Sequence, residues 1–140
     1  SLLILALSSC QPESRGFVLP KGDVQKGKQL FQDLKCHSCH SISDIAWAGS
    51  KEAGDVNLKL GGETTKLKMY GELVTSVINP NHKISQKTFS EQPLTTPEGT
   101  SRMPSNRYND ILTVQQLIDL VAFLQSEYKL QMPEQTYPYY

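Results

Sequence analysis

The stretch Cys36-His37-Ser38-Cys39-His40 carries the most specific chemistry in this sequence and decides its fold. Two thiols separated by two residues on a tight turn can each add to one vinyl group of a haem. The imidazole of His40 then lies beneath the iron, where it can donate a nitrogen as the proximal ligand. We therefore predict one haem c, bound covalently through Cys36 and Cys39 and ligated by His40.

Two other kinds of site also use a Cys-x-x-Cys pair. A zinc site would need a second pair of ligands, and the histidines that remain for it are His37 and His82, with no further Cys beside them. A thioredoxin-like redox pair is expected in a βαβ neighbourhood, which this sequence lacks. Both alternatives fit the sequence less well than haem attachment.

Three helices are predicted around the motif. The first spans about residues 24–35, with Asp23 as its N-cap. The second spans roughly residues 66–78, where apolar side chains recur at three- and four-residue spacing. The third follows a capping-box pattern that begins at Thr113.

Strand signals are nearly absent, and two long irregular stretches, residues 41–63 and 79–112, separate the helices. Loops of this length are uncommon in compact domains. Three short helices with so much loop bury too little apolar surface, so we expect a large apolar prosthetic group at the centre. The predicted fold is all-α, with three or more short helices and long loops wrapped around one covalent haem.

From about Gly22 to Lys129 the sequence resembles the class I cytochrome c domain. Gly27 and Phe31 match the Gly-x-x-x-aromatic pattern of that family's first helix, and Ala122-Phe123-Leu124 matches the aromatic-Leu pair of its last helix. The resemblance implies a cytochrome c-like fold in which these helices cross at the small residue. Glycine inside a helix costs about 1 kcal/mol relative to alanine, so Gly27 also indicates a closely approaching backbone.

The segment Gly54-Asp55-Val56-Asn57-Leu58 resembles the family's Gly-Pro-x-Leu region, but the usual Pro is missing. In the family the carbonyl of that Pro orients the proximal His. The resemblance therefore leaves the hydrogen-bond partner of His40 open, and another carbonyl of the segment could replace it.

The resemblance also implies that Met103 is the sixth, distal ligand of the iron. Met103 precedes Pro104 in the long loop before the last helix, as the family's distal Met-Pro pair does, and follows His40 by 63 residues. The other candidates are Met69 within the middle helix, Met132 in the tail, His37 inside the attachment motif and His82 after a turn. Of these, His82 stays an alternative ligand, whereas His37 is expected to be exposed.

Four further residues lie near these ligands in the sequence and could hydrogen-bond the haem propionates: Trp47, Arg102, Arg107 and Tyr108. Each could equally be a packing or surface residue.

Length and composition fit one soluble domain, with 140 residues of which 38% are hydrophobic and 20% charged. Lys and Arg number 14, as do Asp and Glu, so no global charge indicates binding to nucleic acid. The charges are uneven along the chain. Residues 21–87 contain ten Lys against seven acidic residues, and residues 88–140 contain three basic against six acidic residues.

Residues 1–9 are uncharged, run directly into Cys10 and are shorter than the roughly 20 apolar residues of a membrane span. They are typical of the apolar part of an export signal. Leu7-Ser8-Ser9-Cys10 looks like the lipobox of bacterial lipoproteins. That resemblance implies that Cys10 is acylated and becomes the mature N-terminus. The alternative is an ordinary secretory signal with an incidental Cys, and both interpretations predict export.

The expected layout is a partial export signal (1–9), a lipid-anchored tether (10–22), a cytochrome c domain (23–130) and an extended Pro/Tyr-rich tail (131–140). The expected function is one-electron transfer, not enzyme catalysis, on the periplasmic side of a bacterial membrane. Its expected partners are redox proteins, either for a mobile shuttle or for the cytochrome subunit of a respiratory oxidoreductase. The alternative is a gas-binding sensor or a peroxidase-type enzyme, which requires an open iron site.

Overall fold

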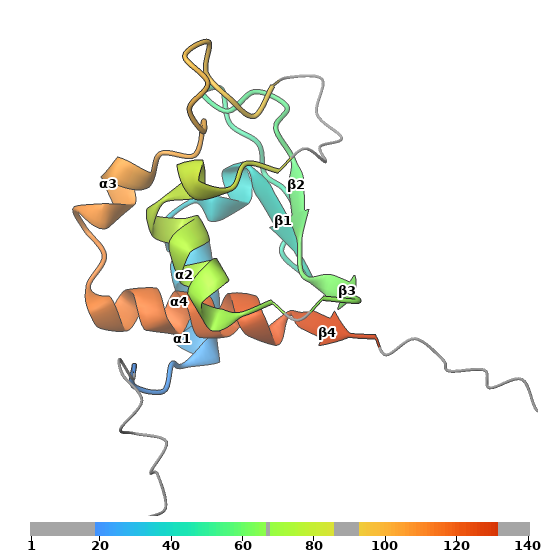
Figure 1. The fold of residues 1–140 in the computed structure, drawn as a ribbon, viewed down its shortest axis with the longest axis vertical. Helices are drawn as coiled ribbons and strands as arrows, with labels where there is room; N and C mark the ends of the chain where they lie inside the picture. The colour runs from blue at the N-terminus through green and yellow to red at the C-terminus, as the bar shows by residue number, and fades with distance from the viewer. Residues whose placement is uncertain (1–18, 67, 86–92, 132–140) are drawn as a thin grey trace, which may run out of the picture.

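The computed structural model describes residues 19–66, 68–85 and 93–131, so the predictions for Cys10, Met132 and most of the tail lie outside it. Figure 1 shows α4 running across α1, with α2 beside them and the strands to one side. The elements in chain order are α1 (Val24–Asp33), η2 (Cys36–Ser38), β1 (His40–Ile42), β2 (Leu58–Leu60), β3 (Gly62–Thr64), α2 (Tyr70–Ile78), η3 (Pro80–His82), α3 (Ser105–Asn109), α4 (Val114–Ser126) and β4 (Tyr128–Leu130).

Helix α1 begins where the sequence predicts. The side chain of Asp23 accepts hydrogen bonds from the backbone N–H groups of Gln25 and Lys26 at 2.9 and 3.1 Å, which confirms it as the N-cap. The helix ends at Asp33, earlier than predicted, because Lys35 has a φ of 59° and lies in the left-handed region. A residue in that conformation cannot continue a right-handed helix.

Helices α1 and α4 cross at Gly27, as the sequence predicts. A Cβ atom added to Gly27 would lie 2.0 Å from the carbonyl oxygen of Asp119 and 2.7 Å from the Cβ of Phe123. One turn further along α1, the rings of Phe31 and Phe123 meet edge to face, with centroids 5.8 Å apart and an interplanar angle of 67°. This glycine therefore sets how closely the two helices approach.

Helix α4 supplies more of the core than any other described element. Its N-terminus has the predicted capping box, in which the Thr113 hydroxyl accepts from the Gln116 N–H at 3.2 Å and the Gln116 side chain accepts from the Thr113 N–H at 2.9 Å. The buried apolar side chains of the described residues are Phe31, Ile42, Ile45, Val56, Leu73, Val77, Ile118, Leu120, Val121, Phe123 and Leu124.

Two expectations about the middle of the chain need correction. Helix α2 begins at Tyr70, not near residue 66, and Met69 is its N-cap residue, with 58% of its surface exposed. The long loop also contains η3 and the short helix α3, which the sequence did not indicate.

The fold is not purely helical. Strand β1 pairs with β2 in parallel, with His40 opposite Leu58, and β3 pairs with β4 in parallel, with Gly62 opposite Tyr128. Each strand has three residues, which is too short for an alternating pattern to be visible in the sequence.

A buried carboxylate joins the two crossing helices. Asp119 on α4 is 4% exposed, and its side chain accepts hydrogen bonds from the Asp23 N–H at 2.9 Å and from the Gln115 side chain at 2.8 Å. The hydrogen bond from the Asp23 backbone is the main reason that the pKa of Asp119 lies below its ordinary value. Asp119 therefore stabilises the crossing in its ionised form.

We predict that Asp119→Asn reduces the acid sensitivity of the fold. Because folding lowers the pKa of this carboxyl, its stabilisation is present above the pKa of an unfolded Asp, about 3.9, and is lost as the pH falls through the lower folded-state value. Urea unfolding at pH 7 and at pH 3 should show a smaller drop in the midpoint for Asp119→Asn than for the wild type. The exposed Asp110→Asn should behave as the wild type, and an equal drop in all three proteins would contradict the assignment.

Candidate haem site

The Cys-x-x-Cys-His motif forms a tight turn between α1 and β1. The left-handed residue Lys35 reverses the chain, η2 holds the first three residues of the motif, and β1 begins at His40. The backbone N–H of Cys39 donates to the carbonyl of Cys36 at 3.1 Å, and the two cysteines form no disulfide with each other. The turn thus presents two thiols and an imidazole within five residues.

A cavity of about 990 Å³ lies next to this turn, at the upper end of the range of roughly 300–1,000 Å³ for ligand pockets. Cys36, His40 and Met103 all line it, whereas Cys39 is half-buried beside it. Much of its wall is apolar, and the apolar side chains include Phe31, Leu34, Leu58, Leu60, Leu73, Val77, Leu112, Leu120 and Leu124. The size and the apolar wall suit a large flat prosthetic group.

The imidazole of His40 lies at the wall of the cavity, and one of its ring nitrogens has no hydrogen-bond partner. Burial lowers the pKa of His40, so its neutral form, the form that ligates metals, is favoured. Its Nδ1 is buried and makes no hydrogen bond of normal geometry. The Leu58 backbone lies opposite His40 in the paired strands and partly offsets the lowered pKa. No hydrogen bond joins it to Nδ1, so the hydrogen-bond partner of His40 stays open.

Burial also affects the thiol of the first cysteine. Desolvation raises the pKa of Cys36 to about 12, and this half-buried residue lines the cavity. Desolvation also raises the pKa of Cys39, and the nearby Arg102 guanidinium opposes that shift.

The segment before α3 carries Met103 to the cavity and is attached to η3. The Ser101 N–H donates to the Asn81 side chain at 2.7 Å, and the Met103 N–H donates to the Ser101 hydroxyl at 3.2 Å. On the other side of Met103, the Ser105 N–H donates to the Met103 carbonyl at 2.9 Å. These bonds fix the backbone on both sides of the methionine.

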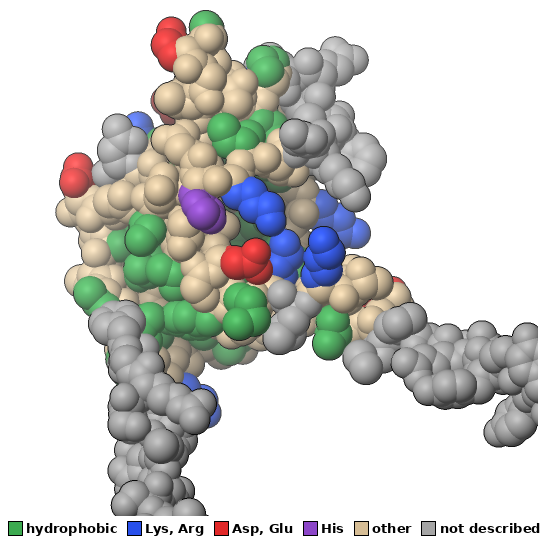
Figure 2. Space-filling model, viewed as in Figure 1, with side chains coloured by type: hydrophobic (Ala, Val, Ile, Leu, Met, Phe, Trp, Pro, Cys, Tyr) green, Lys and Arg blue, Asp and Glu red, His purple; other side chains and the backbone are tan. Residues whose placement is uncertain are grey.

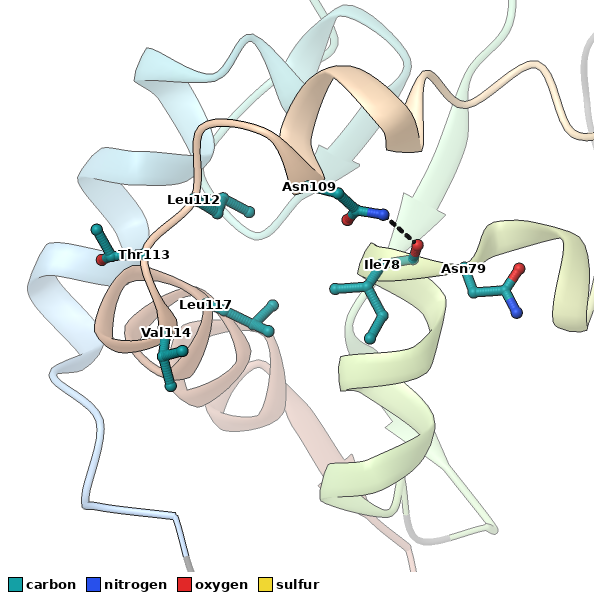
Figure 3. Close-up of a pocket in the computed structure, with 7 residues that line it drawn as sticks. All are labelled: Ile78, Asn79, Asn109, Leu112, Thr113, Val114 and Leu117. Carbon is teal, nitrogen blue, oxygen red and sulfur yellow. Dashed lines mark hydrogen bonds between the residues drawn. The ribbon is translucent and has the colours of Figure 1, made fainter.

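A second attachment holds α3 to the end of α2 (Figure 3). The Asn109 side chain donates to the Ile78 carbonyl at 2.8 Å, across a smaller cleft of about 310 Å³ between α2 and the start of α4. The cleft is lined mainly by aliphatic side chains and brings together none of the predicted haem ligands. The hydrogen bond between Asn109 and Ile78 joins α3, which follows the segment that carries Met103, to the end of α2.

The structure separates the other ligand candidates. His82 lines the same cavity from η3, so it remains a rival of Met103 by position. Met69 does not line the cavity. His37 is half-buried with an unpartnered Nδ1, contrary to the expected exposure, because its chain segment is held against the loop by the bond from the Ala48 N–H to the His37 carbonyl at 2.9 Å.

Three of the four expected propionate partners do not line the cavity, and the fourth is already bonded. Trp47 donates to the Ser38 carbonyl at 2.9 Å, and Arg102 donates to the Pro93 carbonyl at 3.2 Å. Arg107 is exposed and does not line the cavity. Tyr108 lines the cavity, but its hydroxyl donates to the Leu34 carbonyl at 3.3 Å.

Comparison with known proteins agrees with the motif and the cavity. A family model described as Cytochrome c matches residues 24–127. This chain belongs to the cytochrome c family. No curated protein and no solved structure matches it significantly.

The cytochrome c family binds haem c covalently, and this cytochrome has the residues to hold one. When bound, the haem supplies an iron that gains and loses one electron. The described residues around it supply thiols, an imidazole, a thioether and an apolar wall that excludes water. These features match the group in size and in donor chemistry.

Sequence reasoning missed two parts of the site and indicated a third only coarsely. It did not indicate the Leu58 backbone facing His40 or the bond from Ser101 to Asn81. The lysines at the cavity's rim, Lys59, Lys68 and Lys83, were indicated only as members of the lysine-rich segment 21–87. All three features depend on pairings between distant segments.

We predict that Asn81→Ala loosens the segment that carries Met103. Removing the acceptor leaves the Ser101 N–H without its partner, which should cost about 1 kcal/mol of stability. Amide hydrogen exchange at Ser101 in the haem-loaded protein should become faster. Asn79→Ala, in the same turn, should leave that rate unchanged, and equal rates in the wild type and Asn81→Ala would disprove the attachment.

Proposed function

We propose that this cytochrome is a one-electron carrier whose haem is bound to Cys36 and Cys39 and whose iron is held between His40 and Met103. The observation that carries the proposal is that one apolar cavity is lined by Cys36, His40 and Met103 together. An iron with two strong axial ligands has no open position. It transfers electrons through the edge of the haem and does not bind a substrate.

The methionine is the part of this assignment that distinguishes functions. A soft thioether ligand raises the reduction potential relative to an iron with two His ligands. A gas-binding sensor or a peroxidase-type enzyme would instead need the distal position free. His82 at the same cavity would give a carrier of lower potential.

Replacing Met103 with Ala tests the assignment. The wild type should show the weak near-infrared charge-transfer band of methionine-ligated ferric haem and should bind little CO when reduced. Met103→Ala should lose the band, bind CO and have a lower potential, because the iron loses its sixth ligand. Met69→Leu and His82→Asn are the matched controls.

Three results would count against the assignment. If Met103→Ala kept the near-infrared charge-transfer band, Met103 would not be the sixth ligand. If His82→Asn changed the axial ligation and Met103→Ala did not, His82 would be the ligand. If the wild type bound CO readily, the sensor or enzyme would become the better function.

We further propose that Cys10 carries a lipid and tethers the cytochrome to the periplasmic side of a bacterial membrane. The sequence Leu7-Ser8-Ser9-Cys10 supports this proposal. In the part of the chain that the structure describes, no helix is long and apolar enough to cross a membrane. On a tether, the protein would act as a shuttle between redox proteins or as the cytochrome subunit of a respiratory oxidoreductase.

The lipid proposal predicts that the mature protein partitions with membranes and into detergent. Two or more acyl chains anchor a protein stably, whereas one chain binds only marginally. Mass spectrometry should find acyl groups on the N-terminal peptide, and Cys10→Ser should release the protein or block its processing while leaving the haem spectrum unchanged. A wholly soluble wild type with an unmodified Cys10 would refute the anchor.

A further inference from the structure

The guanidinium of Arg102 joins the segment that carries Met103 to a distant loop of the chain. Its Nη1 donates to the Pro93 carbonyl at 3.2 Å, and its Nη2 donates to the carbonyls of Glu52 and Ala53, each at 3.5 Å. These acceptors are backbone atoms, and the two in the loop lie 50 and 49 residues away in the sequence. One half-buried side chain thus connects two segments directly beside a predicted iron ligand.

The chain before Met103 is a hairpin with Arg102 at its last position. The Arg102 N–H donates to the Leu94 carbonyl at 2.9 Å, and an antiparallel bridge joins Thr95 to Ser101. Figure 1 shows this hairpin at the top of the molecule, beside the loop between β1 and β2. Because both the backbone and the side chain of Arg102 are bonded, the place of the hairpin against the loop also sets the place of Met103.

The loop that accepts from the guanidinium is itself bonded to the Cys-x-x-Cys-His motif. The Ser50 hydroxyl accepts from the Ala53 N–H at 2.9 Å and so holds the turn that presents the loop carbonyls. Earlier in the same loop, the Ala48 N–H donates to the His37 carbonyl at 2.9 Å. Arg102 therefore connects the segment of the distal ligand to the part of the chain that holds the motif.

We propose that Arg102 is a positioning residue for Met103: its guanidinium holds the methionine where the thioether reaches the iron. This inference rests on the proposed ligation by Met103. Lysine is a poor substitute, since its ammonium is a single point of charge, whereas the planar guanidinium can donate to two segments at once. Figure 2 shows basic side chains around the hollow of the cavity, below the hairpin, and Arg102 is not one of them because it does not line the cavity.

The test measures how readily imidazole in solution displaces the methionine from the oxidised, haem-loaded protein, followed by the loss of the near-infrared charge-transfer band. In Arg102→Lys and Arg102→Gln, half of the band should be lost at an imidazole concentration at least about threefold lower than in the wild type, the size expected from weakened hydrogen bonds. Arg107→Lys is the matched control, because Arg107 is exposed and does not line the cavity. It should titrate as the wild type does.

A second variant tests the same link from the loop. Ser50→Ala removes the acceptor that holds the turn beneath the guanidinium, so imidazole should again displace the methionine more readily. In Ser50→Ala combined with Arg102→Lys, the two effects should not add, because both residues act through one hydrogen-bond network. Two unrelated losses of stability would add.

The proposal is overturned if Arg102→Lys titrates as Arg107→Lys does, since the charge alone would then suffice. It is also overturned if the effects of Ser50→Ala and Arg102→Lys add in full. In either case Met103→Ala would still abolish the band, so the ligand assignment would stand without the positioning role. A wild type that lacks the band overturns both the ligand assignment and the positioning role.

Discussion

Covalent attachment of a large planar cofactor, which we propose at the end of helix α1, is the constraint on which the rest of this structure depends. The Cys-x-x-Cys-His motif occupies the turn between α1 and β1, so a haem attached there would lie next to the crossing of α1 with α4. Gly27 lets these helices touch, and Phe31, Leu120 and Leu124 then form part of the cavity wall. The remaining lining residues come from β2, α2, η3 and the segment that carries Met103.

This constraint explains which parts of the fold the sequence could predict. The N-termini of α1 and α4 were predictable from their capping residues, Asp23 and Thr113, and the crossing was predictable from Gly27. The start of α2, the short helix α3 and the paired strands were not. They depend on contacts such as Gly62 with Tyr128, which are distant in the sequence and leave no local periodicity.

The residues of the site also fall into those that the sequence could predict and those that it could not. Cys36, His40 and Met103 were recognisable because their chemistry and order along the chain are specific, and the structure brings them to one cavity. The lysine rim was predictable only as part of the lysine-rich segment 21–87, because the lysines that reach the cavity come from separate elements. Trp47 and Arg102 are the opposite case. They lie near the ligands in the sequence, but they do not line the cavity and donate to backbone carbonyls instead.

The central claim is that the haem completes the hydrophobic core of this protein. The most direct test is urea unfolding, followed by far-ultraviolet circular dichroism, of a Cys36→Ala, Cys39→Ala chain that cannot attach haem. We expect little helix and no cooperative transition from this chain, whereas the haem-loaded wild type should unfold cooperatively. A helical signal and a cooperative transition in the haem-free chain, both equal to those of the wild type, would contradict it.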